Sequence, residues 1–189
     1  MNRVEIPDRP EAVTAAWMTE ALAPSLPDLH VTGIEVLDQH SGTTGRLRLG
    51  LEHAPGHDGP ESVFVKLAPF DESQRRLVAA TDMGRREARF YEGPAHEAPL
   101  RIPQCYFAAH GEDRSEYVMV LEDLEAAGCT FSSRLETGAA EHGRQVVEAL
   151  ARLHARFWED PRFEDELAWV QPAMRGRRGA EFVGSVRCV

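Results

Sequence analysis

Lys66 and Glu87 are the two residues of this sequence whose types and spacing most directly suggest chemistry. Lys66 lies within the apolar segment Ser62–Leu67, which predicts a strand, and Glu87 follows 21 residues later in a segment that predicts a helix. A buried ammonium group is costly unless an anion pairs with it, so Lys66 needs an anionic partner. A strand lysine held by a helix glutamate can bind nucleotide phosphates. The alternatives are a lysine that reaches water from an edge strand and a glutamate that faces solvent among the neighbouring arginines.

A small polar turn, Ser41–Gly45, is a second candidate for anion binding. Its two glycines, Gly42 and Gly45, would let backbone N–H groups approach an anion. The hydroxyl groups of Thr43 and Thr44 could donate hydrogen bonds to a phosphate. The turn matches neither of the common glycine-rich phosphate-binding patterns, so an ordinary hairpin turn is the alternative.

The charge and hydropathy of the chain argue against two classes of partner. The net charge of the 189 residues is −10, whereas a protein that binds nucleic acid needs a basic patch. No apolar run approaches the ~20 residues of a membrane-spanning helix, and the N-terminus has no apolar signal core. Three widely spaced cysteines fit reduced thiols. We therefore expect a cytoplasmic protein that binds neither nucleic acid nor membrane.

The remaining segments predict a mixed α+β fold. Apolar periodicity and the placement of proline and glycine predict a helix, three strands, a helix, two strands, a linker and a final helix. The expected ranges are Pro10–Leu22, Val31–Leu37, Arg46–Leu51, Ser62–Leu67, Asp71–Glu92, Ile102–Ala108, Tyr117–Leu121, Glu122–Cys129 and Ala139–Trp158. Val146, Leu150, Leu153 and Phe157 share one face of the final helix, on which His154 is more readily a packing residue than a ligand.

Six motifs, in their order and spacing, resemble the aminoglycoside phosphotransferase and ecdysteroid kinase-like families, which share the protein-kinase-like fold. The motifs are Ser41–Arg46 (SGTTGR), Phe64–Lys66 (FVK), Arg86–Tyr91 (REARFY), Ile102–Phe107 (IPQCYF), Val120–Leu124 (VLEDL) and Leu150–Trp158 (LARLHARFW). The resemblance spans roughly Thr14 to Trp158. It implies an N-terminal lobe with a five-stranded antiparallel sheet and a helix, followed by the first helices of a C-terminal lobe.

The resemblance also implies roles for single residues. Lys66 would contact the α- and β-phosphates of ATP, Glu87 would orient Lys66, and the turn Ser41–Gly45 would cover the phosphates. The backbone carbonyl of Glu122 and the N–H of Leu124 would face adenine, although this acidic stretch could also be a solvated strand end. Mg²⁺ would take part only in a completed enzyme.

The catalytic half of such an enzyme is not visible in the sequence. Phosphoryl transfer in this fold needs an aspartate, an asparagine five residues later and a further metal-binding aspartate. The segment His110–Asp113 lies in a predicted turn of the small lobe, and Val118 stands five residues past Asp113. The pair His57–Asp58 lies in a loop before the lysine strand. We therefore assign no catalytic or metal-binding residue.

These observations predict a division into residues 1–124, a nucleotide-binding lobe, and residues 125–189, a linker and the start of an incomplete helical lobe. The expected function is the ATP-binding portion of a small-molecule phosphotransferase, and an acceptor hydroxyl would bind only if a C-terminal lobe is supplied. A truncated product, half of a split enzyme and a non-catalytic nucleotide- or partner-binding module remain open, the first being favoured. The apolar face of the final helix predicts self-association.

Overall fold

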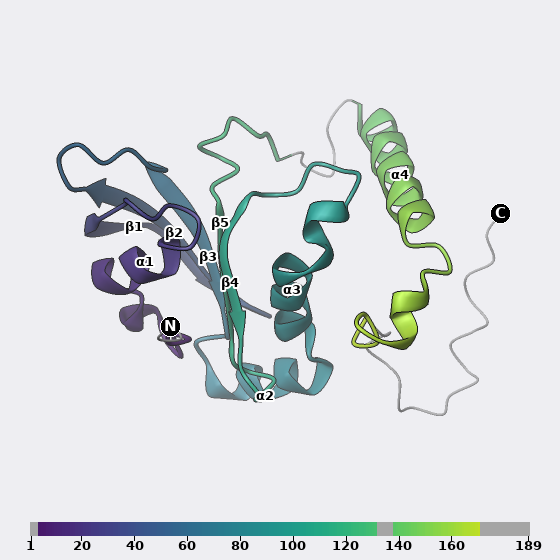
Figure 1. Ribbon diagram of the computed structural model, residues 1–189, viewed down its shortest axis with the longest axis horizontal. Coiled ribbons are helices and arrows are strands. Elements are labelled where there is room, and N and C mark those ends of the chain that lie inside the picture. Colours follow the sequence, from purple (N-terminus) through teal and green to yellow (C-terminus); the bar gives the residue numbers. More distant parts are fainter. Residues whose placement is uncertain (1–3, 132–137, 171–189) are drawn as a thin grey trace.

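A five-stranded antiparallel sheet is the scaffold of the computed structural model, which describes residues 4–131 and 138–170 (Figure 1). The strands lie in the order β1-β2-β3-β5-β4. Their bounds are β1 Val31–Ser41, β2 Gly45–His53, β3 Ser62–Leu67, β4 Cys105–His110 and β5 Tyr117–Glu122. Strand β5 returns between β3 and β4, and Lys66 of β3 stands opposite Met119 of β5. The sheet confirms the predicted α+β fold class.

The main core lies between one face of the sheet and the first helix, α1 (Ala15–Leu22). Every second residue of the central strands is buried there: Leu47, Leu49 and Leu51 of β2, Val63, Val65 and Leu67 of β3, and Val118 and Val120 of β5. Trp17, Met18 and Leu22 of α1 complete the core. Burial of each such side chain contributes about 1.5–3 kcal/mol, so this layer fixes the pleat of the strands and the direction of the alternate side chains.

The first helix begins later than the sequence predicts. The segment Pro10–Leu22 forms a 3₁₀ turn, η1 (Pro10–Ala12), followed by α1. The Thr14 hydroxyl accepts a hydrogen bond from the backbone N–H of Trp17 at 3.2 Å. A hydroxyl in this position caps a helix N-terminus, and this cap explains why α1 starts after Thr14.

The opposite face of the sheet carries helix α3 (Met83–Glu92) (Figure 1). The single helix expected over Asp71–Glu92 is wrong at Asp82, where α2 (Glu72–Thr81) ends and α3 begins. Asp82 has a φ of 58°, a left-handed conformation that aspartate tolerates better than most residues. Its carboxylate accepts a hydrogen bond from Arg85 at 2.8 Å, which stabilises the break.

Helix α3 approaches the sheet closely because of one glycine. A Cβ atom at Gly84 would lie 2.0 Å from Cζ of Tyr117, so no larger residue fits in this position. Glu87 and Ala88 lie three and four residues after Gly84 and therefore share its helix face. The contact thus directs Glu87 toward the sheet.

The C-terminal elements lie beyond α3, away from the sheet (Figure 1). They are α4 (Ala139–Arg156) and η3 (Pro161–Glu164), whereas η2 (Pro94–Glu97) directly follows α3. The Glu97 carboxylate accepts hydrogen bonds from Arg156 and, at 2.8 Å, from Arg162, which join η2 to the later segment. Among the described residues, no helix combines the length and apolar character needed to cross a membrane.

Candidate functional site

Lys66 and Glu87 form an ion pair between β3 and α3. The Lys66 ammonium lies 2.5 and 2.6 Å from the two carboxylate oxygens of Glu87. Lys66 projects from the face of β3 opposite to the fully buried Val65 and Leu67, because side chains alternate along a strand. The side chains are 19 % and 34 % exposed, so the pair is shielded but accessible to a ligand.

The ion pair lies in a cavity of about 380 Å³ between the sheet face and the linker that follows β5. The cavity is lined by Asp38, Arg48, Phe64, Lys66, Glu87, Tyr91, Pro103, Leu121, Glu122, Asp123, Leu124, Glu125 and Phe131. The structure therefore brings four of the candidate residues together, namely Lys66, Glu87, Glu122 and Leu124. The cavity also has aromatic and aliphatic walls, which are common in small-molecule sites, but about half of its lining residues are charged.

The glycine-rich turn does not line this cavity. Strand β1 continues to Ser41, and Gly42, Thr43 and Thr44 join it to β2. A Cβ atom at Gly45 would lie 2.6 Å from the backbone oxygen of Ala68, so packing alone requires this glycine. Thr44 is buried and its hydroxyl accepts a hydrogen bond from Arg46 at 3.2 Å, whereas Thr43 is exposed. A phosphate-covering role for the turn stays a prediction.

Glu122 and Leu124, whose backbone carbonyl and backbone N–H were expected to face adenine, both line the cavity, and these roles stay predictions. The Glu122 carboxylate accepts hydrogen bonds from Arg101 at 2.6 Å and from the backbone N–H of Gln104 at 2.9 Å. The bond from Arg101 is the main cause that lowers the pKa of Glu122 below its usual value. The backbone carbonyl of Leu124 accepts from the N–H of Cys129 at 2.9 Å, while the N–H of Leu124 donates no hydrogen bond to the described residues. Leu124 thus offers a backbone donor beside the cavity.

Asp123 is a cavity residue to which sequence reasoning assigned no role. Its Oδ2 accepts hydrogen bonds from Arg48 and Ser62, both at 2.7 Å. Burial alone would raise the pKa of Asp123, but the bonds from Arg48 and Ser62 outweigh it and hold the pKa below its usual value. The sequence signal that could have placed Arg48 in the cavity is the alternation of side chains along β2. Arg48 stands opposite Phe64 of β3, and Phe64 lies on the same face of the sheet as Lys66.

The cavity combines negative charge with aromatic surface. Five carboxylates and two cations, Arg48 and Lys66, line it. Burial, with a contribution from Glu87, raises the pKa of Tyr91 to about 12, so its hydroxyl stays protonated at neutral pH. Among the described residues, no group of three or more His, Cys, Asp or Glu side chains could hold a metal ion. The cavity thus combines aromatic surface, an excess of carboxylates and the Lys66 ammonium.

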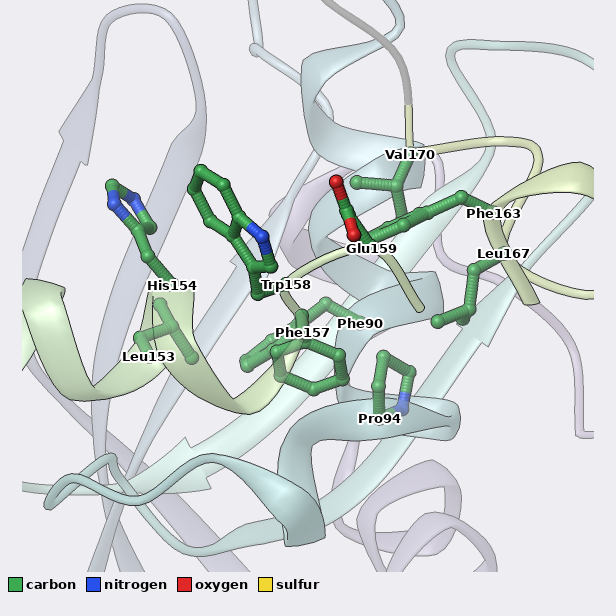
Figure 2. Close-up of a pocket in the computed structure, with 10 residues that line it drawn as sticks. All are labelled: Phe90, Pro94, Leu153, His154, Phe157, Trp158, Glu159, Phe163, Leu167 and Val170. Carbon is green, nitrogen blue, oxygen red and sulfur yellow. The ribbon is translucent and has the colours of Figure 1, made fainter. Parts of the chain in front are cut away.

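A second cavity, of about 420 Å³, lies between α3 and the C-terminal segment (Figure 2). Its walls are formed mainly by Phe90, Pro94, Leu153, Phe157, Trp158, Phe163, Leu167 and Val170. None of the described residues that line it is a lysine or an arginine. Despite its slightly larger volume, it is a poorer phosphate site than the cavity at Lys66.

A known protein family matches more than half of this chain. The model of the ecdysteroid kinase-like family matches residues 38–156. The chain belongs to the ecdysteroid kinase-like family. The matched span includes the ion pair, the linker and α4, and it confirms the resemblance found in the six motifs. Membership of the ecdysteroid kinase-like family indicates a kinase-like phosphotransferase. No curated protein and no solved structure matches the chain significantly.

Proposed function

We propose that the cavity is the ATP site of a small-molecule phosphotransferase, an enzyme that transfers the γ-phosphate of ATP to a substrate hydroxyl. The observation that carries the proposal is the Lys66–Glu87 ion pair inside a cavity that also contains the linker. In kinases, a lysine with this partner contacts the α- and β-phosphates. Such an enzyme would act in the cytoplasm.

The geometry supports one orientation of ATP. The base would lie near Leu124, whose backbone N–H can donate to a ring nitrogen, and the phosphates would lie at Lys66. Glu87 holds the flexible lysine side chain in place, so less conformational entropy is lost when a phosphate binds. Tyr91 and Phe64 would provide apolar contact surface along the cavity.

Phosphate transfer itself needs groups that we do not assign to this chain. The sequence contains a single asparagine, Asn2, so the asparagine that follows the proton-accepting aspartate in kinases has no counterpart. Because the described residues supply no group of three or more metal-binding side chains, we derive no step through Mg²⁺. We propose that the described residues bind ATP and that a further lobe supplies the base, the metal site and the pocket for the acceptor hydroxyl.

The test is nucleotide-induced thermal stabilisation of the whole chain. At an ATP concentration of ten times Kd, binding should stabilise the folded state by about 1.4 kcal/mol, which corresponds to a Tm increase of about 3–6 °C for a chain of this size. Lys66→Ala should remove most of this increase. Arg76→Ala is the matched control, since Arg76 is exposed on α2 and pairs with Glu72. An unchanged ATP response in Lys66→Ala would show that the lysine does not bind phosphate.

The missing asparagine also favours a second candidate, a nucleotide- or partner-binding module without catalysis. The two candidates differ in what happens when a complementary lobe is supplied in trans, because only the first then transfers phosphate. Radiolabelled ATP and a panel of hydroxyl compounds would detect this transfer. Transfer by the chain alone would instead contradict our assignment of the catalytic groups to a further lobe.

A further inference from the structure

Asp123 is the point at which two strands and the linker are joined. Its Oδ2 accepts from Arg48 of β2 and Ser62 of β3. Its Oδ1 accepts from the backbone N–H groups of Glu125 and Ala126, at 3.0 and 3.4 Å. The side chain is 3 % exposed, so these four donors satisfy a carboxylate that water hardly reaches. The linker is therefore anchored to the sheet at its first residue.

We propose that Asp123 is a positioning residue that fixes the linker for recognition of the adenine base, without acting on the phosphates. This inference rests on the proposed ATP site. Asp123 accepts hydrogen bonds from the backbone N–H groups of Glu125 and Ala126, and these bonds make the chain turn at Leu124. The carbonyl of Leu124 accepts a hydrogen bond from the N–H of Cys129, and its N–H donates to none of the described residues, so it is available to a ligand. A donor that is already oriented loses less entropy when a base binds.

The base end and the phosphate end of the cavity are separate in space. Ser62, which binds Asp123, and Lys66, which binds Glu87, lie on the same strand. Four residues of strand separate their Cα atoms by about 13 Å. A change at Asp123 should therefore alter contacts with the base and leave those with the phosphates intact.

Arg48 contributes to the same arrangement. Its guanidinium group donates to Asp123 and pairs with the Glu125 carboxylate at 3.0 Å. Both carboxylates belong to the linker, so Arg48 ties two positions on either side of Leu124 to strand β2. Arg48 is held by two carboxylates of the linker, and we place the phosphates at Lys66, the other cation of the cavity.

The test compares three ligands that share parts of ATP. Calorimetric titration of the whole chain would measure the Kd of ATP, adenosine and tripolyphosphate for wild type, Asp123→Asn and Lys66→Ala. For Asp123→Asn we expect the affinity for ATP and adenosine to fall by about tenfold or more, because the loss of one charge-assisted hydrogen bond has an effect of this size. The affinity for tripolyphosphate should change by no more than about twofold. Lys66→Ala should weaken the binding of ATP and tripolyphosphate and should change adenosine binding by no more than about twofold.

A milder variant keeps the test decisive if Asp123→Asn does not fold. Ser62→Ala removes one of the four hydrogen bonds to Asp123, and it should weaken adenosine binding by a few fold without affecting tripolyphosphate. An equal loss for both ligands, or no loss for adenosine, would overturn the inference. Wild type that binds tripolyphosphate but not adenosine would overturn this inference alone, whereas wild type that binds none of the three would overturn the proposed function as well.

Discussion

Two ionised side chains, Lys66 and Asp123, mark the two ends of the cavity, and each is already paired within the protein. The partner of Lys66 is Glu87, and Asp123 has four donors. A phosphate at Lys66 must share the ammonium with Glu87, which limits affinity but fixes the direction of the lysine. Asp123 accepts hydrogen bonds from four donors of the protein itself and therefore acts on the protein's own backbone and side chains.

The lowered pKa of Asp123 predicts a loss of stability in acid. A group whose pKa is lower in the folded than in the unfolded state stabilises the protein above its unfolded pKa, and this contribution is lost as the pH falls. The loss should begin near the ordinary aspartate pKa of about 4. In urea unfolding between about pH 5 and 3, Asp123→Asn should be less stable than wild type at pH 5 but depend less on pH.

The control for this experiment is Glu11→Gln. Glu11 is an exposed carboxylate without a hydrogen bond or ion pair among the described residues, so its removal should leave the acid dependence of stability as in wild type. Equal pH dependence of Asp123→Asn and wild type would show that the carboxylate gains nothing from Arg48 and Ser62 in the folded state.

At the scale of elements, the position of α3 depends on two residues that lie two positions apart in the sequence. Asp82 ends α2 in a left-handed conformation, and Gly84 lets the following helix contact Tyr117. Sequence periodicity predicted a helix over most of this segment, because proline is lacking and apolar residues recur. The break was not predicted, because an aspartate in the sequence does not by itself indicate a left-handed backbone conformation. The contact with Tyr117 could not be predicted either, because it involves a strand 33 residues away.

Two glycine substitutions test the role of this contact. Gly84→Ala should destabilise the fold by about 1–3 kcal/mol, because the new methyl group overlaps the Tyr117 ring. Gly143→Ala in α4 is the matched control, since nothing lies within 4 Å of its added Cβ. It should stabilise the helix by about 0.5–1 kcal/mol. Chemical unfolding monitored by circular dichroism would measure both, and equal stabilities would contradict the close approach of α3.

At the scale of the whole molecule, α4 presents an apolar face that the described residues do not cover. Val146, Val147 and Leu150 are 44–65 % exposed, and α4 has no buried residue. The ion pairs of Glu97 with Arg156 and Arg162 hold the end of this segment near η2 but leave the face open. An exposed apolar stripe of this kind favours association, and we propose a second copy of the chain as the partner.

A charge on this face should prevent the association. Leu150→Glu places a carboxylate within the stripe and should shift the chain toward the monomer in sedimentation velocity at micromolar concentrations. Ala155→Glu adds the same charge on the opposite, polar side of α4 and should leave the association unchanged. Monomeric wild type, or equal effects of the two variants, would contradict association through this face.

The sequence by itself determined the order of elements, the inward alternation of the central strands and the need of Lys66 for an anionic partner. These features follow from local periodicity and from the cost of a buried, unpaired ammonium group, both of which can be evaluated along the chain. The choice of Glu87 as the partner came from the family resemblance. Only the tertiary structure decided the break at Asp82, the packing role of Gly45 and the junction at Asp123. The partners of Asp123 lie 61 and 75 residues away, and hydrogen bonds over such separations depend on strand register, which no local pattern specifies.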